Sequence, residues 1–102
     1  MKVSKWDTID KPWKGLNSIL KKSHTNKIKH GIDFLEAQAL WTDSDGIEVP
    51  ALTRDEPRFG RIACYGGKLW TAFYTHRADR IRLFSVRRAR LKEEEVYAQK
   101  NT

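Results

Sequence analysis

The sequence predicts an α+β fold with two N-terminal helices, a four-stranded antiparallel β-meander and a C-terminal helix. Hydrophobic residues recur with a period near 3.6 in the first part of the chain, and with a period of 2 from Gly46 onward. Two short turn sequences, Gly66-Gly67 and Ala78-Asp79, divide this second part into strands that can pair as hairpins. With 102 residues, the chain has the length of one domain, which we expect over residues 1–102.

The first helix is predicted over residues 12–30. Its apolar residues follow helical spacing: Trp13, Leu16, Ile19, Leu20 and Ile28. Asp10 and Pro12 suit the first turn of this helix. Lysines occupy its last turns, where cations face the negative end of the helix dipole, and Gly31 should end it as a C-terminal cap.

The second helix should begin immediately afterwards. Asp33 as N-cap and Glu36 three residues later predict a capping box, and Ile32 and Ala37 are spaced for a hydrophobic staple. The helix should reach about Trp41, where the sequence TDSDG stops it.

Strands are expected over residues 46–52, 58–65, 68–77 and 80–88, followed by a helix over residues 88–100. If the turns pair Tyr65 with Lys68 and Arg77 with Arg80, the partners share one face of the sheet. One face is then the predicted core: Ile62, Cys64, Leu69, Phe73, Phe84 and Val86. The other face mixes arginines, aromatic residues and hydroxyls, as expected of a binding surface: Arg61, Tyr65, Trp70, Tyr74, His76, Ile81, Leu83, Ser85 and Arg87.

The charge distribution favours a polyanionic partner. The net charge is +7, and residues 57–92 hold ten basic residues against one acidic residue, a net of +9. Arginines neutralise phosphates, and exposed aromatic side chains stack unpaired bases, so RNA or DNA is the expected ligand. The alternative is that the arginines only protect an exposed sheet edge from aggregation.

Other classes of protein fit the sequence less well. The basic residues do not form one face of an amphipathic helix, so we expect no membrane partner. Three histidines and one cysteine are widely spaced, so no metal site and no cofactor are predicted. The N-terminus lacks the apolar stretch of a secretory signal, and a single cysteine suits a reducing compartment, which together predict a cytoplasmic protein.

Three ordered motifs carry a resemblance to a known family. They are NKIKHGIDFLEA at residues 26–37, RIACYGGKLWTAFYT at residues 61–75 and RIRLFSVRRARLKEEEVY at residues 80–97. Together they resemble the BrnT family, the toxin half of the bacterial BrnT–BrnA toxin–antitoxin systems. The resemblance covers about residues 26–97, whereas residues 1–25 form a divergent, lysine-rich helical extension.

The resemblance implies a RelE-like ribonuclease fold and metal-independent cleavage of RNA that inhibits translation. It also implies a BrnA-like antitoxin as partner, which masks the active face and binds operator DNA. Two alternatives stay open: a non-catalytic nucleic-acid-binding module of the same fold, and a protein whose basic surface only docks an acidic partner.

Metal-independent cleavage requires proton transfer and positive charge around the phosphate that is attacked. Our candidates combine the predicted binding face with the positions that match the family. The candidate catalytic residues are Arg61, Tyr74, Arg87, Arg82 and His30, and the candidate RNA-binding residues are Lys29, Arg88, Trp70, Ser85, His76 and Tyr65.

Overall fold

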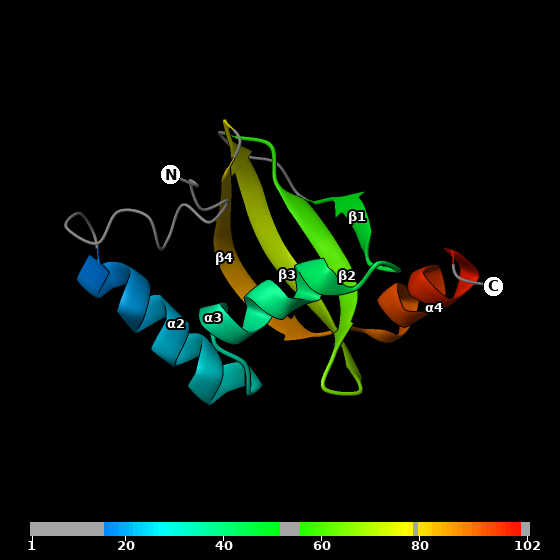
Figure 1. Cartoon of the computed structure of the whole chain (residues 1–102), viewed down its shortest axis with the longest axis horizontal. Coiled ribbons are helices and arrows are strands. Elements are labelled where there is room, and N and C mark those ends of the chain that lie inside the picture. Colours follow the sequence, from blue (N-terminus) through cyan, green and yellow to red (C-terminus); the bar gives the residue numbers. More distant parts are fainter. Residues whose placement is uncertain (1–15, 52–55, 79, 101–102) are drawn as a thin grey trace.

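The computed structural model describes residues 16–51, 56–78 and 80–100 (Figure 1). The helices are α2 (Leu16–His30), α3 (Phe34–Ala37), the 3₁₀ helix η1 (Gln38–Thr42) and α4 (Leu91–Lys100). The strands are β1 (Ile47–Pro50), β2 (Phe59–Tyr65), β3 (Lys68–Arg77) and β4 (Arg80–Arg88). All neighbouring strands are antiparallel in the order β1-β2-β3-β4, which confirms the predicted α+β meander. None of the described helices has the length and apolar character needed to cross a bilayer.

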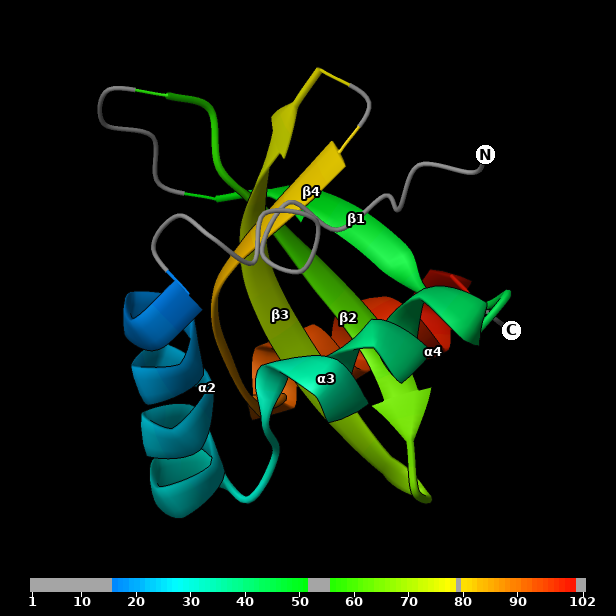
Figure 2. The ribbon, with the colours of Figure 1, turned by 60° about the vertical axis from the view of Figure 1, so that its left-hand side comes forward.

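The sheet lies between two helical layers. Helix α3 and η1 lie on one side of it and α4 on the other, while α2 lies along the β4 edge, as the two views in Figures 1 and 2 show. The hydrophobic core lies under α3 and η1, and its buried members are Ile32, Phe34, Ala37, Leu40, Ala63, Trp70, Ala72, Tyr74, Ile81, Leu83 and Val86. Alanines at two central sheet positions leave room for the helices to approach closely.

Helix α2 ends as predicted, but two of its apolar residues are exposed. Gly31 has φ +83° and its N–H donates to the carbonyl of Lys27 at 2.9 Å, which confirms the C-terminal cap. Asp10, Pro12 and the expected first turn lie outside the described residues. Leu20 and Ile28, which follow the helical spacing, are 56% and 72% exposed, so these two apolar residues do not pack into the core.

Polar side chains attach α2 to the sheet and to α3 instead. The Asn26 amide accepts a hydrogen bond from the Val86 N–H at 3.1 Å, and donates to the Val86 carbonyl at 2.9 Å and the Ile32 carbonyl at 2.7 Å. Ser23 accepts the Phe34 N–H at 3.0 Å. Asn26 therefore satisfies the exposed edge of β4 as a neighbouring strand would.

The start of the second helix confirms the sequence prediction. Asp33 accepts the Glu36 N–H at 2.7 Å and Glu36 accepts the Asp33 N–H at 3.0 Å, which completes the capping box. Ile32 and Ala37 are fully buried, as a hydrophobic staple requires. The α-helix extends only to Ala37, and η1 continues from Gln38 to Thr42.

Both predicted hairpin registers are confirmed, but a bulge interrupts the last strand. Tyr65 pairs with Lys68, and Arg77 pairs with Arg80. Farther along, Tyr74 pairs with Leu83 while Phe73 pairs with Ser85, so Phe84 is an extra residue in β4. Beyond Phe84, every side chain of β4 therefore lies on the face opposite to the one predicted by simple alternation.

The predicted assignment of the two faces was wrong. The expected binding face is the one that the helices cover: Tyr74 is fully buried and Trp70 is 6% exposed. Cys64, expected in the core, is exposed. Because of the bulge, Val86 joins the helix-covered core, whereas Ser85 and Arg87 lie on the same side of the sheet as α4. Alternation separates two sets of side chains, but it does not specify which set the helices will cover.

Helix α4 is joined to the sheet by an acidic residue. The two Glu93 carboxylate oxygens each accept a hydrogen bond from Arg87 at 2.8 Å, and Oε1 also accepts from the Arg90 N–H at 2.7 Å and the Thr71 hydroxyl at 2.9 Å. At the far end of the helix, the Tyr97 hydroxyl donates to Asp43 at 2.9 Å, which links α4 to the segment after η1.

Acid should weaken the attachment of α4. Partial burial would raise the pKa of Glu93, but the hydrogen bonds from Arg87, Arg90 and Thr71 lower it to about 2. A carboxylate with a lowered folded-state pKa adds stability above its unfolded pKa, and this stability is lost as the pH falls from about 4.5 toward about 2. When the pH is lowered from about 7 to about 3, the free energy of unfolding of the wild type should fall by about 1–2 kcal/mol more than that of Glu93→Gln. Urea unfolding at the two pH values measures both changes.

The exposed Glu95, on the same helix, supplies the matched control. Glu95→Gln should show the same loss on acidification as the wild type. An equal loss in the wild type and in Glu93→Gln would contradict the proposed role of the Arg87–Glu93 pair.

Candidate active site

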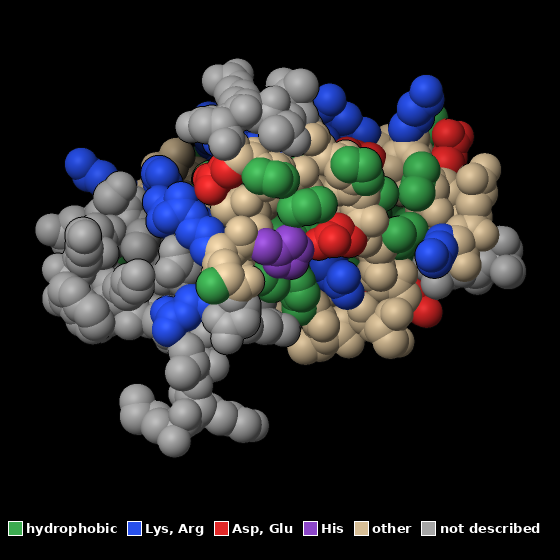
Figure 3. All heavy atoms as spheres, turned by 90° about the horizontal axis from the view of Figure 1, so that it is seen from above, with side chains coloured by type: hydrophobic (Ala, Val, Ile, Leu, Met, Phe, Trp, Pro, Cys, Tyr) green, Lys and Arg blue, Asp and Glu red, His purple; other side chains and the backbone are tan. Residues whose placement is uncertain are grey.

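Four polar residues meet where β1, β2 and β3 lie side by side, and we call them the Glu48 cluster: Glu48, Arg61, Tyr74 and His76. Glu48 Oε2 accepts a hydrogen bond from the Tyr74 hydroxyl at 2.5 Å and lies 2.9 Å from His76 Nε2. The side chains of His76 and Glu48 are 47% and 42% exposed, so the pair is open to solvent. In Figure 3 the molecule is seen from above, and a histidine lies at the surface beside an acidic side chain. Lys or Arg side chains and hydrophobic side chains surround the two.

Tyr74 holds the Glu48 carboxylate in place from beneath. Its ring is fully buried and contacts Trp41 edge-on, with ring centroids 5.0 Å apart. Burial and the hydrogen bond to Glu48 raise the pKa of Tyr74 far above its ordinary value. The hydroxyl therefore stays protonated and is a fixed hydrogen-bond donor to Glu48.

Glu48 is ionised and orients the imidazole ring of His76. Partial burial alone would raise the pKa of Glu48, but hydrogen bonds from Tyr74 and His76 and the charge of Arg61 lower it. An ionised carboxylate only accepts hydrogen bonds, so the Nε2 atom of His76 must carry the hydrogen and its Nδ1 atom is the basic nitrogen when the ring is neutral. The arrangement is that of a histidine positioned for proton transfer.

Arg61 places a cation beside this pair. Its guanidinium donates to the carbonyls of Leu40 at 3.1 Å and Asp43 at 3.0 Å, which attaches η1 to the sheet. A Cβ atom at Gly46 would clash with the Arg61 guanidinium, so a larger residue there would displace this side chain from its present position. The two carbonyls occupy only part of the guanidinium's donors, and its charge acts on both Glu48 and Tyr74.

The structure thus brings together three sequence-predicted residues: Arg61, Tyr74 and His76. Arg87, expected beside them, lies on the opposite face of the sheet, where it pairs with Glu93 and its guanidinium stands 5.0 Å from the centre of the Phe73 ring. Arg82 lies on that same face, opposite Thr75. The expectation that Arg61, Tyr74 and Arg87 share one face is therefore wrong.

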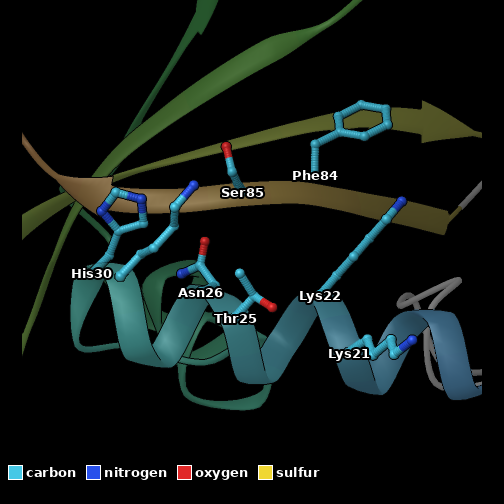
Figure 4. Close-up of a pocket in the computed structure, with 8 residues that line it drawn as sticks. Lys21, Lys22, Thr25, Asn26, His30, Phe84 and Ser85 are labelled. Carbon is cyan, nitrogen blue, oxygen red and sulfur yellow. The ribbon is translucent and has the colours of Figure 1, made fainter.

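A second group of predicted residues meets elsewhere. His30, Lys29 and Ser85 line a groove between α2 and β4 (Figure 4). The remaining candidates have structural contacts. The Trp70 indole donates to the Tyr65 carbonyl at 3.0 Å, and the Arg88 guanidinium lies 5.5 Å from the centre of the Trp70 ring.

Sequence reasoning missed Glu48 as a member of the site. The available signal was the opposite charge of Glu48 and Arg61 on neighbouring predicted strands, since opposite charges favour cross-strand pairing. In the sheet these two residues are indeed partners. The length of the segment between β1 and β2 concealed that register, because it contains no short turn sequence.

Comparison with protein families agrees with the sequence motifs. The model of the family described as "Ribonuclease toxin, BrnT, of type II toxin-antitoxin system" matches residues 20–93. The match includes the Lys29-His30-Gly31 motif, the whole sheet and most of α2. No curated protein matches the sequence. Because the family model covers well over half of the chain, the protein belongs to the BrnT family of ribonuclease toxins of type II toxin–antitoxin systems.

Proposed function

We propose that the chain is a metal-independent endoribonuclease whose active site is the Glu48 cluster. The observation that carries this proposal is the Glu48–His76 pair at 2.9 Å, with the carboxylate held from beneath by the buried Tyr74 hydroxyl. A histidine oriented by a fixed carboxylate and open to solvent is suited to proton transfer. Family membership supplies the class of substrate, RNA.

The reaction can be written with this chain's own residues. His76 Nδ1 accepts the proton of a ribose 2′-hydroxyl, and the 2′-oxygen attacks the adjacent phosphorus. A bond forms between O2′ and phosphorus, the bond to O5′ breaks, and the leaving O5′ takes a proton from water. Arg61 stabilises the additional negative charge on the phosphorane. The products are a 2′,3′-cyclic phosphate and a 5′-hydroxyl end.

The biological setting follows from the family. A type II system pairs the toxin with an antitoxin protein. We propose that this partner is BrnA-like, that it covers the active surface and binds operator DNA, and that RNA cleavage by the free toxin inhibits translation. The proposal also includes a RelE-like mode of action in the bacterial cytoplasm.

The test is cleavage of a generic single-stranded RNA by the purified chain in excess EDTA, with analysis of the product ends. We expect cleavage that EDTA does not reduce, with 2′,3′-cyclic phosphate ends. Activity that disappears in EDTA and returns with Mg²⁺ would contradict metal independence. Salt-sensitive RNA binding without cleavage would favour the non-catalytic binding module.

A further inference from the structure

A groove of about 310 Å³ lies between α2 and β4, apart from the Glu48 cluster. Its walls are Lys21, Lys22, Thr25, Asn26, Lys29, His30, Phe84 and Ser85. Figure 4 shows Lys22 extending from α2 toward β4, with Phe84 on the strand beyond it and His30 at the other end. A volume near 300 Å³ is at the small end of ligand sites and suits one monomer unit of a longer chain.

The described lining of the groove is strongly basic. It includes three lysines and a histidine, and none of the described lining residues is acidic. Lys27, on the same helix, forms an ion pair with Glu36 at 2.7 Å, whereas Lys21, Lys22 and Lys29 form none with any described residue. The lysines gathered along this groove make a local positive potential, which favours binding of an anion there.

The remaining walls suit the atoms of a phosphodiester. Thr25 and Ser85 present hydroxyls that can donate to phosphate oxygens. The Arg58 guanidinium lies 4.2 Å from the centre of the Phe84 ring and adds a further cation near that wall. Lysines act as flexible point charges, so they suit contact with a backbone and not the reading of base edges.

The groove is built on fixed elements. The three hydrogen bonds of Asn26 hold α2 against the β4 edge at Val86. The β4 bulge lies directly before this point and places both Phe84 and Ser85 at the groove, where regular alternation would have separated them. The bulge that moves the later β4 side chains to the opposite face of the sheet therefore also forms this wall of the groove.

The position along β4 separates the groove from the proposed bond-breaking site. Ser85 pairs with Phe73, whereas His76 pairs with Ile81 near the hairpin end of the same strands. We propose that the groove is a binding site for the phosphodiester backbone of single-stranded RNA, distinct from the place of cleavage. This inference rests on the proposed function only in taking RNA as the substrate.

The test measures binding of a short 2′-O-methyl RNA, which the proposed reaction cannot cleave because its 2′-hydroxyl is blocked. Affinity is titrated between about 50 mM and about 300 mM salt for the wild type and for the double variant Lys22→Ala/Lys29→Ala. Each lost phosphate contact should reduce the slope of log affinity against log salt by about 0.7, a total of about 1.4. The control, Lys92→Ala/Lys100→Ala on α4, removes the same charge from exposed positions elsewhere.

Several outcomes would overturn the assignment. One is an equal decrease in slope for the groove and control variants, which would show only a general effect of net charge. Another is unchanged RNA binding by the groove variant together with weaker binding of polyglutamate, which would assign the groove to an acidic protein segment. A third is a fall in kcat with unchanged KM on cleavable RNA, because a separate binding site should change KM.

Failure of the proposed active site would be visible separately. His76→Asn should lose cleavage but keep the groove's share of the salt dependence of 2′-O-methyl RNA binding, because Lys22 and Lys29 are unchanged in this variant. A loss of slope confined to the Lys22→Ala/Lys29→Ala variant would support the groove even if His76→Asn cleaved RNA as fast as the wild type.

Discussion

Replacing His76 with asparagine should lower kcat/KM for RNA cleavage by about 10²–10⁴-fold, because it removes the group proposed to accept the 2′-hydroxyl proton. RNA affinity should change little, since asparagine keeps a polar side chain of similar shape next to Glu48. Initial rates on a defined RNA, with binding measured separately, check this prediction. His24→Asn is the matched control, because His24 is exposed on α2 and touches neither site.

Glu48 should act through His76 as a positioning residue. Glu48→Gln removes the charge that orients the ring and should lower kcat with little change in KM, whereas Glu48→Asp keeps a carboxylate and should recover part of the rate. Tyr74→Phe removes the hydroxyl that holds Glu48 Oε2 and should have a smaller effect of the same kind.

A different result would place the chemistry elsewhere. If His76→Asn cleaved RNA at the wild-type rate and His30→Asn did not, the active site would lie in the α2–β4 groove. The Lys29-His30-Gly31 motif would then hold the catalytic histidine, as the family resemblance suggested.

Replacing Asn26 with alanine should reduce the free energy of unfolding by about 3–5 kcal/mol. The side chain is only 5% exposed and makes three hydrogen bonds to backbone groups of Ile32 and Val86. Its loss leaves one backbone N–H and two backbone carbonyls without hydrogen-bond partners. Each unsatisfied buried group costs about 1–3 kcal/mol. Urea unfolding followed by circular dichroism measures the change.

Two variants define this prediction further. Thr25→Ala, at the neighbouring exposed position of α2, should change stability by less than about 0.5 kcal/mol. Asn26→Asp should destabilise about as much as alanine, because a carboxylate can accept the Val86 N–H but repels the two carbonyls. A loss below about 1 kcal/mol for Asn26→Ala would mean that α2 is held by other contacts.

The relation between sequence and structure is clearest at the helix ends and hairpins. Gly31, the Asp33–Glu36 capping box and the Tyr65–Lys68 and Arg77–Arg80 pairs are local, since each depends on residues within a few positions along the chain. Short-range backbone preferences decide such features, so pattern reading predicts them well. The packing of α2 could not be predicted in this way. It depends on the contact of Asn26 with Val86, 60 residues away, which no local pattern encodes.

The candidate site divides in the same way. The motifs indicated Arg61, Tyr74, His76, Lys29, His30 and Ser85 as candidates, but not that they form two sites. Arg61, Tyr74 and His76 meet Glu48 because β1 adds to the sheet in one register, which places Glu48 opposite Arg61. The intervening segment is long enough to permit other registers, so the sequence alone did not bring Glu48 into the site.

By itself, the sequence determined the α+β class, the order and approximate limits of the strands, both hairpin turns and the family. Only the tertiary structure decided which sheet face the helices cover, where β4 bulges and which charged residues meet. Alternation along a strand does not indicate which of its two faces is covered. A single extra residue such as Phe84 also moves every later side chain of the strand to the opposite face. The choice between the faces follows from the packing of Ile32, Phe34 and Leu40 against Ala63 and Ala72, contacts that exist only once the chain has folded.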